Sequence, residues 1–167
     1  GVIALGGEFT NQGEPRPYMF RAHPHVIDVL ADAGVDVVTV GNNHAGDYGP
    51  AALTEMLDRL TAAGIGYAGG GHDLADAKRP YYQKIGDTVV AVVGADLTVA
   101  RPVRATGKRA GPLHLDMRRK PQPKKVAAAL TEILAEARRH AHVVLFSPHW
   151  GDNWQEQPTP EIRELAR

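Results

Sequence analysis

The stretch Val35-Asp-Val-Val-Thr-Val-Gly-Asn-Asn-His44, continued by Ala45-Gly-Asp-Tyr-Gly-Pro50, is the most informative part of this chain. Its apolar, β-branched first half predicts a buried strand, and Pro50 fits the first turn of a helix. A strand that delivers polar side chains into a glycine-rich turn before a helix is typical of an α/β protein. Asn43 offers a neutral oxygen ligand and His44 a titratable nitrogen, which suits a metal-assisted hydrolytic site. The alternative is turn chemistry alone, because asparagine tolerates left-handed backbone and caps helices.

The composition narrows the class of protein. With 167 residues, the chain is long enough for one domain with a sizeable core. Lysine plus arginine and aspartate plus glutamate number 19 each, so nothing in the charge favours a nucleic-acid partner. No apolar run approaches the ~18 to 20 residues of a membrane span, and residues 1–20 lack the order of a signal peptide. The absence of cysteine excludes disulfides, thiolate metal ligands and thiol catalysis.

Strands and helices alternate along the chain. Helices are predicted over residues 25–33, 50–63, 74–78 and 124–140, with a last helix opening at Pro160 behind a Thr159 cap. Strands are predicted over residues 2–5, 35–40, 65–68, 81–85, 88–93 and 142–147, the fourth and fifth as a β-hairpin. This alternation implies right-handed crossovers and a largely parallel sheet. Residues 69–74 are predicted to be a flexible turn. Residues 94–122 are predicted to be a long, basic, irregular connection, either solvated or facing an anionic polymer.

Polar residues follow three of the predicted strands, namely Glu8, Asn43 with His44, and His149. Because the carboxyl ends of strands in an open α/β sheet lie along one edge, we expect these side chains to converge. A carboxylate, an amide oxygen and an imidazole suit manganese, iron or zinc better than a calcium cage of oxygens alone. Asp47 could orient His44 or cap the helix that begins at Pro50, and the cap is the favoured interpretation.

Other polar residues are weaker candidates. Arg21, Asp47 and Trp150 are the candidates for contact with substrate. The competing interpretations are a surface ion pair for Arg21 and aromatic packing under a loop for Trp150. Four further histidines have no partner at a useful spacing and are predicted to be exposed: His72, His114, His140 and His142.

Several of these motifs resemble the CapA family, the poly-γ-glutamate capsule-synthesis type. The most specific are Asn42-Asn-His-Ala-Gly-Asp-Tyr-Gly49 and His149-Trp-Gly151, with further similarity at residues 18–24, 63–69 and 158–161. The resemblance implies a layered α/β (α+β) fold, the calcineurin-like metallophosphoesterase sandwich flanked by helices. The family's opening Gly-Asp strand and closing Gly-His-x-Pro-His motif have no counterpart here. We therefore expect residues 1–167 to form a single incomplete domain, truncated at both ends.

The resemblance also implies roles for individual residues. It makes Asn43, His149 and Glu8 metal ligands, and His44 the catalytic acid that meets the leaving group. The motif that ends at Glu8 reads Gly-Gly-Glu where the family has Asn-Leu-Glu, so its asparagine is absent. Asn153 stands where the family often has a glutamate, which removes an acidic role at that position.

Three functions fit these expectations. The favoured one is a metal-dependent hydrolase that acts on a phosphoester or a peptide-like amide, with an anionic or peptide-like polymer or a small molecule as substrate. The second is a non-catalytic accessory subunit that handles the polymer. The third is a metal-dependent epimerase of a peptide residue. The family fold implies two divalent ions (manganese, iron or zinc), and a protein tethered outside the cell by an anchor upstream of Gly1.

Overall fold

The computed structural model describes residues 1–10, 18–98, 103–117, 123–151, 154 and 156–167. The first part of the chain folds into short strands and two helices. In chain order these are β1 (Val2–Ile3), β2 (Arg21–Ala22), α1 (His25–Asp32), β3 (Val37–Thr39), α2 (Gly49–Ala62) and β4 (Gly66–Ala68). β1 pairs with β2 and β3 pairs with β4, both in parallel. Their apolar side chains form one core with the inner faces of the helices, including Val2, Ile27, Val40, Leu53, Leu57 and Leu60.

The second part of the chain builds a sheet under one long helix. It comprises β5 (Gly70–Gly71), α3 (Leu74–Lys78), β6 (Tyr81–Ile85), β7 (Thr88–Asp96), β8 (Gly111–Pro112), α4 (Pro123–His140), β9 (Val143–His149) and α5 (Pro160–Leu165). β6 and β7 form the predicted antiparallel hairpin, β9 adds to β7 in parallel, and β5 pairs with β8. The second core joins α4 to one face of β7, through residues such as Ala91, Val93, Val126, Leu130, Ile133 and Ala137.

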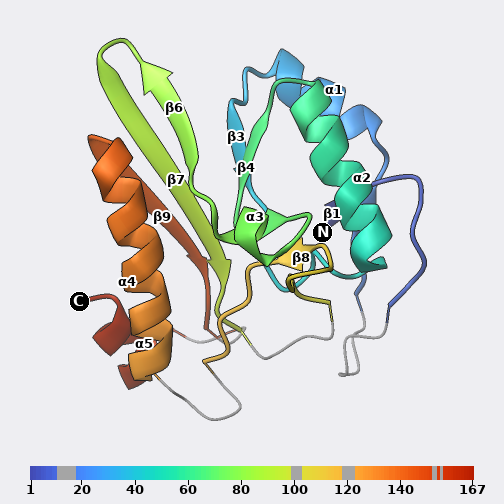
Figure 1. Cartoon of the computed structure of the whole chain (residues 1–167). Coiled ribbons are helices and arrows are strands. Elements are labelled where there is room, and N and C mark those ends of the chain that lie inside the picture. The colour runs from blue at the N-terminus through green and yellow to red at the C-terminus, as the bar shows by residue number, and fades with distance from the viewer. Residues whose placement is uncertain (11–17, 99–102, 118–122, 152–153, 155) are drawn as a thin grey trace.

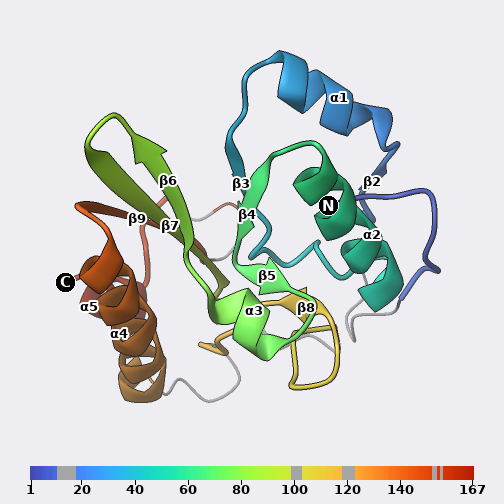
Figure 2. The same ribbon diagram turned by 45° about the horizontal axis from the view of Figure 1, so that its top comes forward.

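The two parts lie side by side (Figure 1), and α3, β5 and β8 lie between them (Figure 2). α4 covers the β6–β7–β9 sheet on one side of the molecule, and α1 and α2 flank β3 and β4 on the other. The layered α/β class predicted from the sequence is confirmed. The single, largely parallel sheet is not found, because the described strands form four separate sheets with three parallel and two antiparallel pairings.

Glycines let the β3–β4 ladder pack directly on the backbone of β7. A Cβ atom on Gly41, just after β3, would lie 2.8 Å from the Ala95 nitrogen. A Cβ on Gly69, just after β4, would lie 2.6 Å from the carbonyl carbon of Gly94. Gly69 also has a φ of +81°, which glycine adopts without strain. Because no side chain separates these backbones, the ends of β3, β4 and β7 meet at one place in the molecule.

Several strand boundaries differ from the prediction. β7 continues through Asp96 and β9 through His149, both further than the apolar pattern suggested. The expected flexible turn contains β5, whose glycines are buried against β8 in the segment expected to be irregular. Two-residue strands carry no periodic pattern, so only their partners define them. In the part of the chain that the structure describes, no helix is both long and apolar enough to cross a membrane.

Candidate functional site

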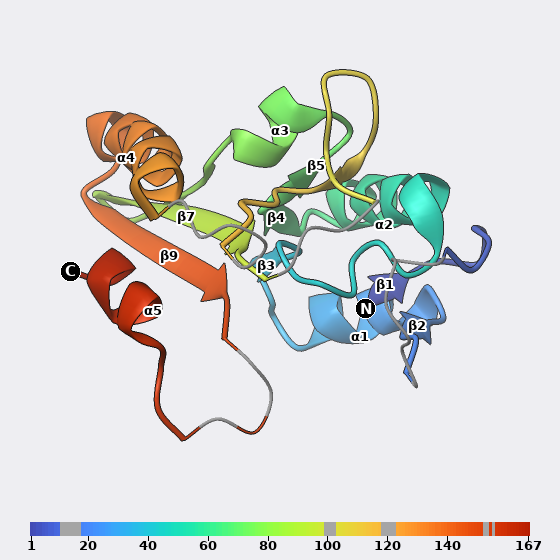
Figure 3. The same cartoon turned by 90° about the horizontal axis from the view of Figure 1, so that it is seen from below.

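The ends of β3 and β9 meet at a polar contact. His149 is the last residue of β9, and its Nε2 lies 3.0 Å from Oδ1 of Asn43, four residues beyond the end of β3. A second contact joins the same strands, because Oγ1 of Thr39 lies 3.4 Å from Oγ of Ser147. Figure 3 shows the arrowhead of β9 beside β3. Two residues 106 positions apart in sequence are therefore brought within hydrogen-bonding distance.

Asp47 orients His44. Nδ1 of His44 lies 2.8 Å from Oδ2 of Asp47, and the same oxygen accepts a hydrogen bond from the Phe20 amide at 3.1 Å. No side-chain hydrogen bond caps α2, so the favoured interpretation of Asp47 as a helix cap is wrong. The orientation of Asp47 depends on tertiary structure, because the Phe20 amide, from a distant segment, is the second hydrogen-bond donor to its carboxylate. Asp47 is fully buried, so its carboxylate acts through His44 and presents no surface to a substrate.

His44 itself is held but accessible. Its side chain is 26% exposed, and the ring of Phe20 packs edge-on against the imidazole with centroids 4.7 Å apart. The His44 amide also donates to Oδ1 of Asn42 at 3.0 Å. Because Nδ1 faces Asp47, any proton exchanged with a bound molecule passes through Nε2. The imidazole is therefore oriented for acid–base chemistry at a partly solvated position.

Glu8 lies beside this turn with its side chain exposed. Its backbone oxygen accepts a hydrogen bond from the Thr10 hydroxyl at 3.2 Å, and the Thr10 amide donates to the backbone carbonyl oxygen of Asp47 at 3.0 Å. The segment before it is tied to α2, because the Leu5 and Gly6 amides donate to the Glu55 carboxylate at 3.0 and 2.9 Å. This contact of Glu8 is made by its backbone, and its predicted role as a metal ligand stays a prediction.

The donor atoms fit part of a metal site. An amide oxygen from Asn43 and an imidazole nitrogen from His149 are ligand types that manganese, iron and zinc accept. They are fewer than the four ligands of a tetrahedral zinc site. Among the described residues, no three histidine, aspartate or glutamate side chains are grouped so that they could hold one ion. A complete site needs further ligands from outside this set.

The remaining candidates make other contacts. The Arg21 guanidinium stacks over the Tyr48 ring at 4.4 Å and is exposed. Trp150 is partly buried and packs against the core formed with α4. Of the four histidines predicted to be exposed, His72, His140 and His142 are exposed, whereas the side chain of His114 is buried, with 3% of it accessible. The prediction for His114 was wrong because its partner comes from another strand.

That partner is Asp96, which the sequence analysis missed. Asp96 ends β7 and is fully buried, with Oδ2 lying 3.2 Å from Nδ1 of His114. Burial alone raises the pKa of the Asp96 carboxyl, but hydrogen bonds from His114 and Thr98 outweigh it and hold the pKa below its usual value. The position at the carboxyl end of a strand is the same signal that identified Asn43 and His149. It was overlooked because β7 was expected to end at Val93.

The layered α/β fold with polar side chains at its strand ends agrees with the sequence motifs, and the chain belongs to the PGA_cap family of bacterial capsule synthesis proteins. The family model matches residues 2–167. The motif-based expectation of CapA-type membership is thereby confirmed.

Two relatives show how far the similarity extends. The PGA biosynthesis protein CapA of Bacillus subtilis is 29% identical over 142 residues, which is 84% of this chain and 35% of the relative. The capsule biosynthesis protein CapA of Bacillus anthracis is 26% identical over 147 residues, covering 87% of this chain and 34% of the relative. The chain therefore spans about a third of the length of these two relatives.

One crystal structure is also similar. It is of a Staphylococcus aureus protein named provisionally as a 5′-nucleotidase and solved with α-ketoglutarate, with a TM-score of 0.43 and 16% identity. The match covers 92% of this chain and 37% of that one. This likeness is too low to support a statement about function.

Proposed function

We propose that the protein containing this chain is a capsule-synthesis hydrolase that uses divalent metal at the Asn43–His149 contact. Its substrate class would be a phosphoester or a peptide-like amide, carried by an anionic polymer or a related small molecule. The observation that carries the proposal is the 3.0 Å approach of Asn43 Oδ1 and His149 Nε2 from two distant strands. Capsule and PGA biosynthesis, named for the two Bacillus relatives, support the polymer context.

Asn43 and His149 would hold the metal, with Glu8 as the predicted carboxylate ligand. When bound, such an ion makes coordinated water acidic near neutral pH and polarises a phosphoryl or acyl oxygen. The amide oxygen of Asn43 stays neutral at every pH, so it would neither compete for protons nor add charge. The imidazole of His149 would bind in its neutral form, which makes metal affinity fall as the solution becomes acidic.

His44 would be the general acid. Nδ1 of His44 contacts the Asp47 carboxylate, so Nε2 is the ring nitrogen that would face a leaving group. Packing of Phe20 against the ring keeps this orientation. Proton donation by a positioned imidazole contributes ~10²–10⁴ in rate.

The test is to measure metal content of the complete protein, then turnover of a generic phosphodiester and of polyglutamate. We expect Asn43→Ala to lower metal content and His44→Ala to keep metal but lose ~10²–10⁴ in turnover. His25→Ala is the matched control, because His25 Nδ1 also lies near an aspartate three residues on, Asp28, at 3.0 Å. That pair is exposed and lies in α1, so turnover should not change.

Other results would select other functions. Metal that stays bound without turnover of either substrate would contradict hydrolysis and favour an accessory role. Deuterium uptake from solvent at a peptide α-carbon would identify an epimerase instead. Equal turnover of the His44→Ala and His25→Ala variants would remove His44 from the chemistry.

A further inference from the structure

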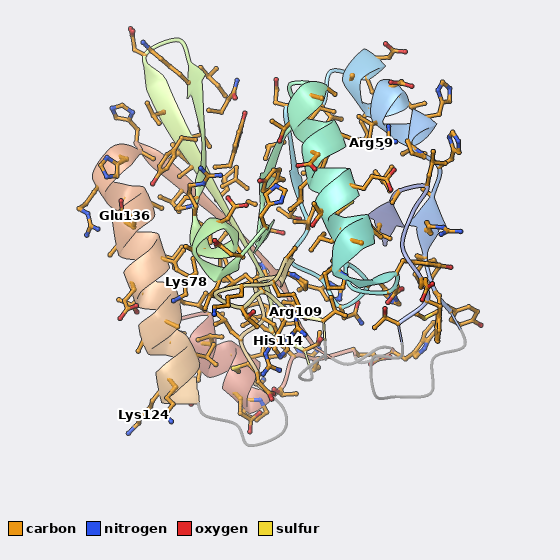
Figure 4. All side chains as sticks on the ribbon, turned by 45° about the vertical axis from the view of Figure 1, so that its right-hand side comes forward. Arg59, Lys78, Arg109, His114, Lys124 and Glu136 are labelled. Atoms are coloured by element: carbon orange, nitrogen blue, oxygen red, sulfur yellow. The ribbon has the colours of Figure 1, made fainter. Side chains whose placement is uncertain are left out.

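A row of three ionisable residues crosses the carboxyl end of the sheet. Asp96 is the register partner of His149 on β9, and on its other side it forms a parallel bridge with His114. Register partners in a sheet point to the same face, and neighbouring strands lie roughly 5 Å apart. His149, Asp96 and His114 therefore stand in a row on one face, with Asn43 in contact with its first member. Figure 4 shows His114 in the lower part of the molecule, between α4 and α2.

Asp96 determines which nitrogen of His114 carries a proton. One carboxylate oxygen of Asp96 accepts from the Thr98 amide at 3.0 Å and the Thr98 hydroxyl at 2.7 Å. The other lies 3.2 Å from Nδ1 of His114. An ionised carboxylate only accepts hydrogen bonds, so Nδ1 must be the donor. In the neutral ring, Nε2 of His114 then carries the lone pair.

This lone pair is enclosed in the protein. The His114 side chain is 3% exposed, and its Nε2 is inaccessible to solvent. Within the part of the chain that the structure describes, this nitrogen has no hydrogen-bond partner. Buried polar atoms are nearly always paired, so one left without a partner calls for a ligand or a functional reason.

We propose that His114 Nε2 is a further binding nitrogen for a divalent transition-metal ion and that Asp96 is the carboxylate that orients it. Metal-ligating histidines commonly donate their other ring N–H to a carboxylate, which is the arrangement of this pair. Imidazole nitrogen suits zinc, iron and related ions. The inference rests on the proposed function, which supplies the class of metal ion. It extends the proposed metal site at Asn43 and His149 across β7 to His114.

The test is zinc titration of the complete protein labelled with ¹⁵N in its histidines. In the metal-free protein we expect the His114 ring to be the tautomer protonated at Nδ1, assigned by comparison with His114→Gln. Added Zn²⁺ should shift the Nε2 resonance of His114. Asp96→Asn should weaken zinc binding about 10–100-fold while His114 is still present. The matched controls are His25→Gln and Asp28→Asn, which alter the exposed pair and should leave zinc affinity unchanged.

Two results would overturn the inference. One is a His114 Nε2 resonance that does not move while zinc saturates the protein, which would leave that nitrogen to a buried water. The other is a tautomer protonated at Nε2. Neither depends on turnover, so loss of the proposed hydrolase activity with a zinc-dependent His114 shift would contradict only the proposed function. Turnover with an unchanged His114 would contradict only this inference.

Discussion

His44 with Asp47 and His114 with Asp96 make the same contact in different surroundings. Both place Nδ1 of the imidazole beside Oδ2 of a fully buried aspartate, at 2.8 and 3.2 Å. The His44 side chain is 26% exposed, whereas that of His114 is 3% exposed. The second nitrogen of His44 can therefore meet a substrate, and that of His114 can meet only a buried ligand. The solvent accessibility of the second ring nitrogen, more than the histidine–aspartate pair itself, therefore sets the available chemistry.

The most disruptive test of this comparison replaces each aspartate by asparagine. Asp96→Asn should lower the free energy of unfolding by about 2–3 kcal/mol, because it removes the charged carboxylate that accepts hydrogen bonds from a buried imidazole and from Thr98. Asp47→Asn should cost about 1–2 kcal/mol, since water can reach His44 and replace part of the lost interaction. Asp28→Asn, in the exposed pair with His25, should have no measurable effect. Urea denaturation of the three variants measures the order.

Equal losses at the three positions would show that burial of the pair does not govern its contribution. A larger loss for Asp47→Asn than for Asp96→Asn would reverse the comparison, and would point to the Phe20 amide as the partner that matters most.

The next test moves the two pairs relative to one another. Gly41 lies between the turn that carries His44 and the Ala95 backbone next to Asp96, so Gly41→Ala forces a Cβ into a 2.8 Å contact. We expect a loss of about 1–3 kcal/mol in stability from this overpacking. NMR should also show loss of the Asn43–His149 contact. Gly107→Ala is the control, because a Cβ there meets nothing within 4 Å. An unchanged contact in Gly41→Ala would mean that the close backbone approach does not position the site.

A smaller effect on stability is expected from Glu55, whose carboxylate is not fully buried. Hydrogen bonds from the Leu5 and Gly6 amides, assisted by Arg59, hold the pKa of Glu55 below its usual value. Because this pKa is lower in the folded protein than in the unfolded chain, the ionised carboxylate stabilises the fold above the unfolded pKa of ~4.3. This contribution to stability is lost as the pH falls through the folded pKa. Amide shifts of Leu5 and Gly6 should therefore move in acid, and Glu55→Gln should abolish that step. A step that persists in the variant would assign it to another group.

The smallest effect concerns a carboxylate whose partner is a neutral phenol. The Tyr67 hydroxyl donates a hydrogen bond to the Asp76 carboxylate at 3.1 Å, and both residues line a cleft of about 800 Å³. Burial, together with the charge of Asp76 and this hydrogen bond, raises the pKa of Tyr67 to about 12. Because the pKa of Tyr67 is higher in the folded protein than in the unfolded chain, the protonated phenol stabilises the fold below the unfolded pKa of ~10. This contribution is lost as the pH rises through the folded pKa. Tyrosinate absorbance should show the late ionisation, and Tyr67→Phe should remove it. Asp76→Asn should bring it to lower pH, and an unchanged curve would leave burial as the whole cause.

Elements with a strong pattern were predicted well from the sequence. Apolar residues at helical spacing located α2 and α4, and a glycine turn between two apolar runs located the β6–β7 hairpin. The rule that polar residues at strand ends converge also predicted that Asn43 and His149 would lie close together, as they do. It missed Asp96 because a buried carboxylate at the end of β7 interrupts the apolar pattern that marks the strand.

Periodicity and motifs are local properties, so they were enough to predict the α/β class, the family and the residue types available at the strand ends. Which of these residues contact one another depends on how distant segments pack. Asp47 turns to His44 because Phe20 arrives from a distant segment, and His114 is buried because Asp96 lies beside it across the sheet. Such choices depend on partners far apart in the chain, and no spacing within one segment can encode them.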